Sequence, residues 1–133
     1  MTRRVFIIFA IAIILCGAAA AAYRAAAIER RTTVEAEALT GGHVEAGRAA
    51  VKTYGCDVCH TIPGVADARG LVGPPLTQIA NRIYIAGVLT NTPDNLIEWI
   101  QNPPGVDPRT AMPNLGVEET AARDIAAYLY TLR

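Results

Sequence analysis

Two cysteines and a histidine stand close together in the run Cys56-Asp57-Val58-Cys59-His60. Two thiols separated by two residues, with a histidine directly after the second, form the attachment signature of a c-type haem. Each thiol can add to one vinyl group of the porphyrin, and the imidazole of His60 can then ligate the iron. The motif therefore predicts one covalently attached haem c, bound through Cys56 and Cys59 and ligated by His60.

A zinc site and a dithiol redox pair are the alternative interpretations of the two thiols. Zinc would need a second pair of ligands, and the only other cysteine and histidine are Cys16, in an apolar run, and His43. A thioredoxin-like pair needs strand–helix–strand patterning around the motif, which the sequence lacks. Both alternatives are therefore disfavoured.

Met112 is the candidate for the second axial ligand of the iron. Met1 is the initiator, so Met112 carries the only internal thioether, and it lies in a loop that Pro108 and Pro113 stiffen. A soft sulfur suits ferrous iron, whereas ordinary core packing is the alternative role for this side chain. We therefore predict His60 and Met112 as the two protein ligands of the metal.

Helices are the elements expected to position these residues, because no alternating strand pattern is present. Thr92 followed by Pro93 is typical of a helix start, and Pro103-Pro104 should stop that helix. An irregular loop is expected between Pro63 and Pro75. The predicted helices are 44–54, 92–102 and 118–132. The fold class is therefore all-α, with a thin core that a buried macrocycle would complete.

An uncharged apolar run extends from Val5 to Ala22, after Arg3 and Arg4. Eighteen helical residues span about 27 Å, close to the roughly 30 Å hydrocarbon core of a bilayer. The run is either a retained transmembrane anchor, which we prefer, or a signal peptide that ends in small residues. The predicted organisation is an anchor or signal at 1–22, a helical linker at 23–40 and a domain at 41–133.

The predicted linker is rich in Ala, Glu and Arg and contains no Gly or Pro, which favours a continuing helix. We expect an exposed spacer, with a docking surface for another membrane protein as the alternative. The pair Gly41-Gly42 should break the helix and mark the domain boundary.

From Gly41 to Arg133 the sequence resembles a class I cytochrome c, a small helical domain around one covalently bound haem. Gly73-Pro74-Pro75-Leu76 resembles the loop that follows the family's haem motif. Trp99 and Asn102-Pro103 stand before Met112 at the family's spacing. The terminal run Ile125–Leu129 resembles the last helix, which in the family crosses the first helix near the position of Gly47.

The resemblance also implies roles for four further residues. The carbonyl of Pro74 would accept the N–H of the ligand imidazole, and Trp99 would line the haem pocket. Arg82 and Thr110 would lie near haem propionates, although a solvated surface position is an equal alternative for Arg82. With Cys56, Cys59, His60 and Met112, these complete the predicted cofactor-binding residues.

The function that the resemblance implies is single-electron transfer, with no substrate turnover by the chain itself. Lys52 is the only lysine, which argues against a lysine-rich docking ring, and a net charge of zero gives no basic face for nucleic acid. The short span between loop and methionine and the N-terminal anchor resemble bacterial forms. The expected partners are therefore a quinol-oxidising complex as donor and a haem-copper terminal oxidase as acceptor. The alternatives are a fixed electron-transfer subunit of a larger oxidase or dehydrogenase, and a haem sensor or peroxidase with a displaceable Met112.

The orientation in the membrane also follows from the resemblance. Arg3 and Arg4 favour a cytoplasmic N-terminus, but Arg24, Arg30 and Arg31 oppose it on the other side of the apolar run. The family attaches its haem outside the cytoplasm. We therefore expect a single-pass protein of the bacterial inner membrane with the haem domain on the periplasmic side.

Overall fold

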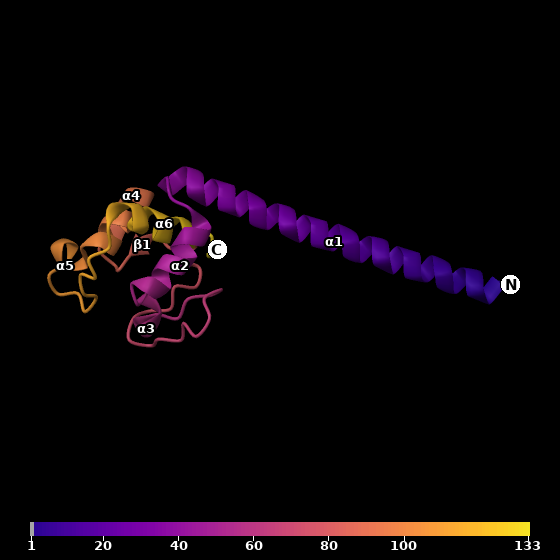
Figure 1. The fold of residues 1–133 in the computed structure, drawn as a ribbon, viewed down its shortest axis with the longest axis horizontal. Helices are drawn as coiled ribbons and strands as arrows, with labels where there is room; N and C mark the ends of the chain where they lie inside the picture. The colour runs from indigo at the N-terminus through magenta and orange to yellow at the C-terminus, as the bar shows by residue number, and fades with distance from the viewer. Residues whose placement is uncertain (1) are drawn as a thin grey trace. The chain divides into compact units, whose positions relative to one another are not determined.

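A computed structural model describes residues 2–133 and is predominantly helical (Figure 1). The elements are α1 (Thr2–Thr40), α2 (Val44–Thr53), α3 (Cys56–Cys59), the 3-10 helix η1 (Ile79–Asn81), β1 (Tyr84–Ile85), β2 (Leu89–Thr90), α4 (Pro93–Gln101), α5 (Pro103–Val106) and α6 (Glu119–Tyr130). The chain forms two compact units: the first ends at Thr32, and the second is Thr33–Arg133.

Helix α1 carries the apolar run of the sequence without interruption. Its large apolar side chains between Val5 and Leu15 are each at least half exposed. Its most apolar 18-residue window has a mean hydropathy of 2.8. Among residues 2–133, α1 is the one helix with the length and composition to cross a membrane, criteria that an N-terminal signal sequence also meets. A lipid environment would cover the apolar side chains that the protein leaves exposed.

The last turns of α1 belong to the second compact unit. Ala36 and Thr40 are buried there, and the guanidinium of Arg123 donates to the Thr40 carbonyl at 3.1 Å. Glu37 accepts a hydrogen bond from the backbone N–H of Val44 at 3.0 Å. We expected an exposed spacer up to residue 40 and a boundary at Gly41, whereas the second unit begins at Thr33. Small side chains such as Ala36 give the sequence no strong apolar stripe that would reveal this packing.

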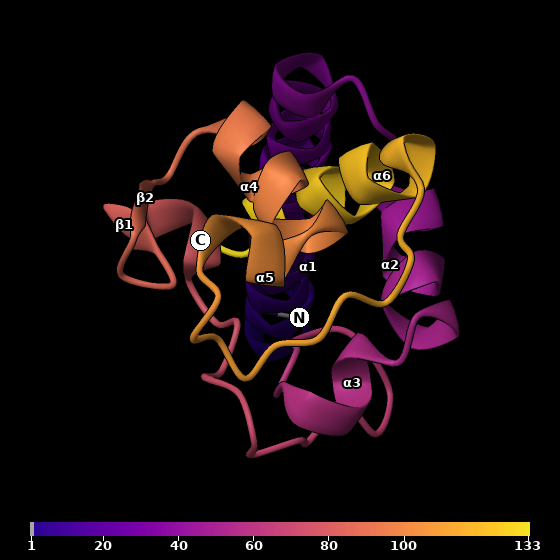
Figure 2. The same ribbon diagram turned by 90° about the vertical axis from the view of Figure 1, so that its left-hand side faces the viewer.

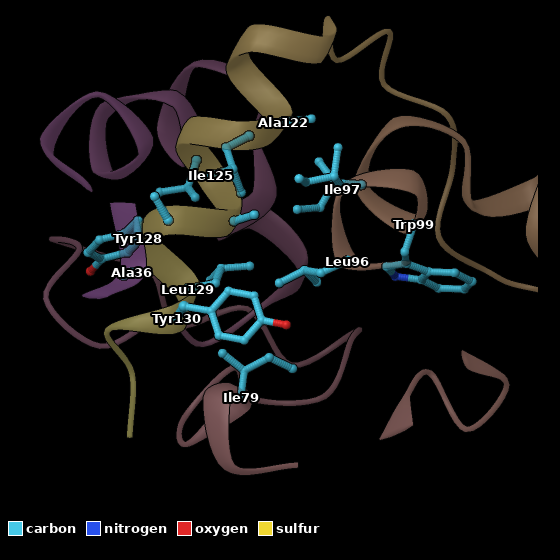
Figure 3. Packing of buried hydrophobic residues seen from close by; sticks show 14 of the residues in the cluster. Ala36, Ile79, Leu96, Ile97, Trp99, Ala122, Ile125, Tyr128, Leu129 and Tyr130 are labelled. Carbon is cyan, nitrogen blue, oxygen red and sulfur yellow. The ribbon is translucent and has the colours of Figure 1, made fainter. Parts of the chain in front are cut away.

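Helices α2 and α6 pack against each other in the second unit (Figure 2). A Cβ atom at Gly47 of α2 would overlap backbone atoms of Asp124 in α6, so glycine permits the close approach. The predicted crossing near Gly47 is confirmed. The core lies along the inner face of α6, where Ile125 and Leu129 pack with residues of α4 (Figure 3).

Helix α4 begins as predicted, because the Thr92 hydroxyl accepts from the Asn95 N–H at 3.3 Å and Pro93 occupies the first turn. It ends at Gln101, but the following prolines do more than stop it. Pro103 starts the short helix α5, and Asn102 caps it by accepting from the Gly105 N–H at 3.3 Å. A proline in the first turn lacks only an N–H that would be unpaired there in any case.

A short β-hairpin corrects the expectation of an entirely helical domain. Tyr84 pairs with Thr90, and Ile85 pairs with Leu89, in antiparallel register. Ala86 and Gly87 form the turn with φ of 51° and 75°, the left-handed conformation that tight hairpin turns favour. Strands of two residues are too short to produce an alternating pattern, so hydrophobic periodicity could not predict them.

Candidate functional site

The motif Cys56–His60 begins with one short helical turn, α3, which follows α2. Gly55 makes the connection in a left-handed conformation, with φ of 70°. Cys56 and Cys59 then occupy the two ends of α3, and both are free thiols. The backbone N–H of His60 donates to the Cys56 carbonyl at 3.0 Å, and the chain leaves the turn in an extended conformation. This turn holds both thiols and the imidazole within a few residues of each other.

The ring of His60 is oriented by the segment 73–77, which we call the proline loop. Nδ1 of His60 lies 2.7 Å from the Pro74 carbonyl oxygen. A carbonyl only accepts, so Nδ1 carries the proton and the lone pair of Nε2 is free to ligate a metal. A Cβ atom at Gly73 would overlap the His60 ring, so glycine is needed for the loop to lie against it. The resemblance anticipated this contact between His60 and Pro74.

One cavity of about 780 Å³ lies beside the motif, within the range of ligand and cofactor pockets of roughly 300–1,000 Å³. All eight predicted site residues line it: Cys56, Cys59, His60, Pro74, Arg82, Trp99, Thr110 and Met112. Apolar side chains of α2, α4 and α6 form much of the remaining wall: Val51, Leu96, Ile100, Ile125 and Leu129. The structure therefore brings together predicted site residues that are up to 56 positions apart in the sequence.

Met112 reaches the cavity from the loop between α5 and α6 and is half-buried. Its backbone N–H donates to the Thr110 hydroxyl at 3.1 Å, and the Thr110 N–H donates to the Asp107 carbonyl at 3.0 Å. Thr110 thus fixes the loop conformation beside the thioether. Its hydroxyl hydrogen is still available to a ligand, so contact with a propionate stays a prediction.

Arg82 and Trp99 lie at the cavity in different ways. Trp99 is 8% exposed on α4 and packs in the core. Arg82 is half-buried, and its Nη2 donates to the carbonyls of Pro75 and Thr77 in the proline loop. Arg82 is therefore not a freely solvated surface residue, and its expected contact with a propionate stays a prediction.

The thiol chemistry does not favour a dithiol redox pair. Burial raises the pKa of the Cys56 thiol to about 11, against an ordinary value of 9.0. A catalytic dithiol needs a lowered pKa, because the thiolate is the nucleophile. Cys56 in this environment is a neutral thiol at physiological pH, which does not favour disulfide exchange.

The donor set of the cavity fits an iron porphyrin. Within residues 2–133, no group of three or more His, Cys, Asp or Glu side chains could hold a metal ion by itself. An ion bound by one imidazole and one thioether must bring its other ligands, which a macrocycle supplies. The apolar walls, the two thiols and the free Nε2 of His60 agree with this requirement.

Part of the cavity wall was not predicted from the sequence. Tyr84, Ile85, Ala86 and Gly87 of the hairpin line it, and so does Leu115. None of these residues belongs to a motif, and the strands of the hairpin are too short for an alternating pattern. Gly87 between apolar residues was the one local signal of a turn.

The chain is 30% identical over 102 residues to a cytochrome c oxidase subunit 2 from Alkalihalophilus pseudofirmus. The matched region covers 76% of this chain and 29% of that protein, so the chain spans less than a third of its relative's length. No protein-family model and no solved structure matches the chain.

Proposed function

We propose that this chain is a membrane-anchored, monohaem c-type cytochrome that carries single electrons in a bacterial respiratory chain. One observation carries the proposal: two free thiols, an imidazole with a free Nε2 and a thioether line the same apolar cavity. The similarity to a cytochrome c oxidase subunit supports a role in respiratory electron transfer. A membrane association is supported by α1.

The roles of the residues follow from this geometry. Cys56 and Cys59 would attach one haem c, and His60 and Met112 would bind its iron. Such a haem, when bound, supplies a reversible one-electron couple of its iron. The Pro74 carbonyl orients His60 and makes it a stronger donor, while the apolar walls exclude water. With both His60 and Met112 bound to the iron, no position would be open to a substrate, so we expect no substrate turnover.

An apolar surface beside the motif is the face through which we propose that electrons leave. Val58, Leu71 and Val72 are 73%, 87% and 80% exposed, and Val58 and Val72 also line the cavity. The chain's single lysine, Lys52, gives this face no basic ring. A redox partner would therefore dock there mainly through apolar contacts, with a quinol-oxidising complex as donor and a haem-copper oxidase as acceptor.

The test is expression of the full chain in a host that attaches haem c, followed by intact mass and absorption spectroscopy. We expect the mass of the chain plus one haem and a low-spin spectrum with the weak far-red band of a sulfur–iron bond. A colourless protein with the mass of the polypeptide alone would overturn the proposal. A high-spin ferric spectrum would instead support a sensor or peroxidase with a displaceable Met112.

A fixed subunit of a larger oxidase is the second candidate, because the curated relative is itself an oxidase subunit. Extraction from the membrane with a mild detergent separates the two candidates. Comigration with oxidase activity on sizing supports the fixed subunit, whereas a single small haem particle supports a mobile carrier. The same membranes test the proposed periplasmic orientation, since protease added to intact spheroplasts should then remove the haem domain.

A further inference from the structure

Asn91 joins three parts of the second compact unit by hydrogen bonds. Its Nδ2 donates to the carbonyls of Ile79 at 2.8 Å and Arg82 at 2.9 Å. Its Oδ1 accepts from the Tyr130 hydroxyl of α6 at 3.0 Å. Carbonyl oxygens only accept, so the amide nitrogen must face Ile79 and Arg82, and both of its hydrogens are used. The terminal helix is thereby tied to the backbone around Arg82.

Arg82 extends this connection to the proline loop. Its Nη2 donates to the carbonyls of Pro75 and Thr77, the latter at 3.2 Å. Pro74 and Pro75 have no N–H of their own. The loop's own N–H groups at Gly73 and Leu76 donate to the carbonyls of Cys59 and Thr61, each at 2.8 Å, and Arg82 adds the two hydrogen bonds at Pro75 and Thr77, the residues on either side of Leu76. Asn91 holds the backbone of Arg82, and Arg82 in turn holds the loop.

The proline loop in turn contacts the imidazole of His60. Pro75 follows Pro74, whose carbonyl oxygen lies 2.7 Å from Nδ1 of His60. A displacement of the loop changes the length and angle of that hydrogen bond. A stronger bond to Nδ1 makes the imidazole a better donor, which stabilises the oxidised metal and lowers its reduction potential.

We propose that Asn91, held in place by Tyr130, is a positioning residue that fixes the proline loop through Arg82 and so sets the strength of the His60–Pro74 hydrogen bond. This inference rests on the proposed function, in which His60 ligates a haem iron. Loss of the Asn91 amide should loosen the loop, weaken the bond to Nδ1 and raise the reduction potential.

The variants are Asn91→Ala, which removes both donors, and Tyr130→Phe, which removes only the hydroxyl that holds Asn91. Tyr130→Phe preserves the buried ring, so it decides the test if Asn91→Ala does not fold. The matched control is Asn95→Ala. Asn95 also donates twice through Nδ2, to the Thr90 carbonyl at 2.8 Å and the Thr90 hydroxyl at 3.1 Å, so its side-chain hydrogen bonds go to Thr90 rather than to the backbone of Arg82.

The full haem-loaded chain is measured by NMR in the ferrous state and by redox titration. Solvent exchange of the His60 Nδ1 hydrogen should be about tenfold faster in Asn91→Ala, which corresponds to the loss of roughly one net hydrogen bond. Its reduction potential should rise, and Tyr130→Phe should shift both quantities less in the same direction. Asn95→Ala should leave both unchanged. Exchange of the Leu129 amide in the core, which reports global unfolding, should stay the same in Tyr130→Phe.

Equal exchange rates and potentials in Asn91→Ala and Asn95→Ala would overturn the inference while the haem protein itself stands. If Asn91→Ala is unstable, an unchanged His60 exchange rate in Tyr130→Phe would overturn it in the same way. A wild-type chain without haem would overturn the proposed function, and this inference with it.

Discussion

Gly47→Ala tests the helix crossing on which the cavity depends. Gly47 is buried in α2, and a Cβ atom there would overlap backbone atoms of Asp124 and lie 3.0 Å from the Ile125 nitrogen. Backbone atoms cannot rotate away as a flexible side chain would. The two helices must therefore move apart. This weakens the packing of α2 against α6, which places α6 beside the cavity.

Two opposing terms set the size of the effect. Alanine in the middle of a helix is favoured over glycine by about 1 kcal/mol. Overpacking in a core costs about 1–3 kcal/mol, and a collision with backbone belongs at the upper end of that range. The expected net loss in free energy of unfolding is therefore about 2 kcal/mol. For a unit of about 100 residues this lowers the melting temperature by roughly 8 °C.

The assay is urea unfolding of the haem-loaded protein followed by circular dichroism, with thermal melts beside it. Ala46→Gly is the matched control, because Ala46 is the exposed neighbour on the same helix and its change reports helix propensity alone. It should cost about 1 kcal/mol. A Gly47→Ala protein as stable as wild type, or more stable, would refute the argument that the backbone contact requires glycine.

Three further predictions concern the ligand, a helix cap and alkaline stability. Met112→Ala should keep the haem covalently bound but abolish the far-red sulfur–iron band, and an unchanged ferric spectrum would assign the sixth ligand elsewhere. Thr92→Ala removes the cap of α4 and should lower the free energy of unfolding by about 1 kcal/mol, while Thr92→Ser should keep most of it in urea titrations. Burial raises the pKa of Tyr128 and Tyr130 above the usual value of 10.0, so the unfolded chain ionises first. The stability that these two tyrosines contribute should therefore be retained well below pH 10 and be lost as the pH rises through 10, and Tyr128→Phe should reduce that loss in unfolding curves measured between pH 9 and 11.

Much of the helical framework could be predicted because the signals are local. Thr92-Pro93 specifies a cap and a first turn, and the apolar repeat of the last helix specifies its buried face. The crossing at Gly47 was predicted only through a family resemblance, since nothing in the neighbouring residues shows what a glycine faces. The hairpin at 84–90 was not predicted, because each strand has only two residues and cannot show the alternation of apolar and polar side chains that indicates a strand.

The candidate site likewise contains residues that could be predicted from the sequence and residues that only the structure places. The motif Cys56–His60 predicted the chemistry directly, because both thiols and the imidazole lie on one turn of chain. Met112 followed from composition, since no other internal thioether exists. The position of Arg82 was left open between solvent and propionate, and the structure instead turns its guanidinium to the proline loop. The role of Asn91 could not be predicted from the sequence, because its partners Ile79, Arg82 and Tyr130 are 12, 9 and 39 residues away.

The amino-acid sequence by itself determined the thiols, imidazole and thioether that we propose bind a haem, the amphipathic helices and an apolar N-terminal run long enough to cross a bilayer. These features depend on residue type and short spacing, which the chain carries before it folds. Only the tertiary structure decided which helices approach closely, that Ala36 is buried, and that Asn91 and Arg82 support the loop behind His60. Such contacts join distant segments, and their geometry depends on how the whole core packs rather than on any fixed interval along the chain.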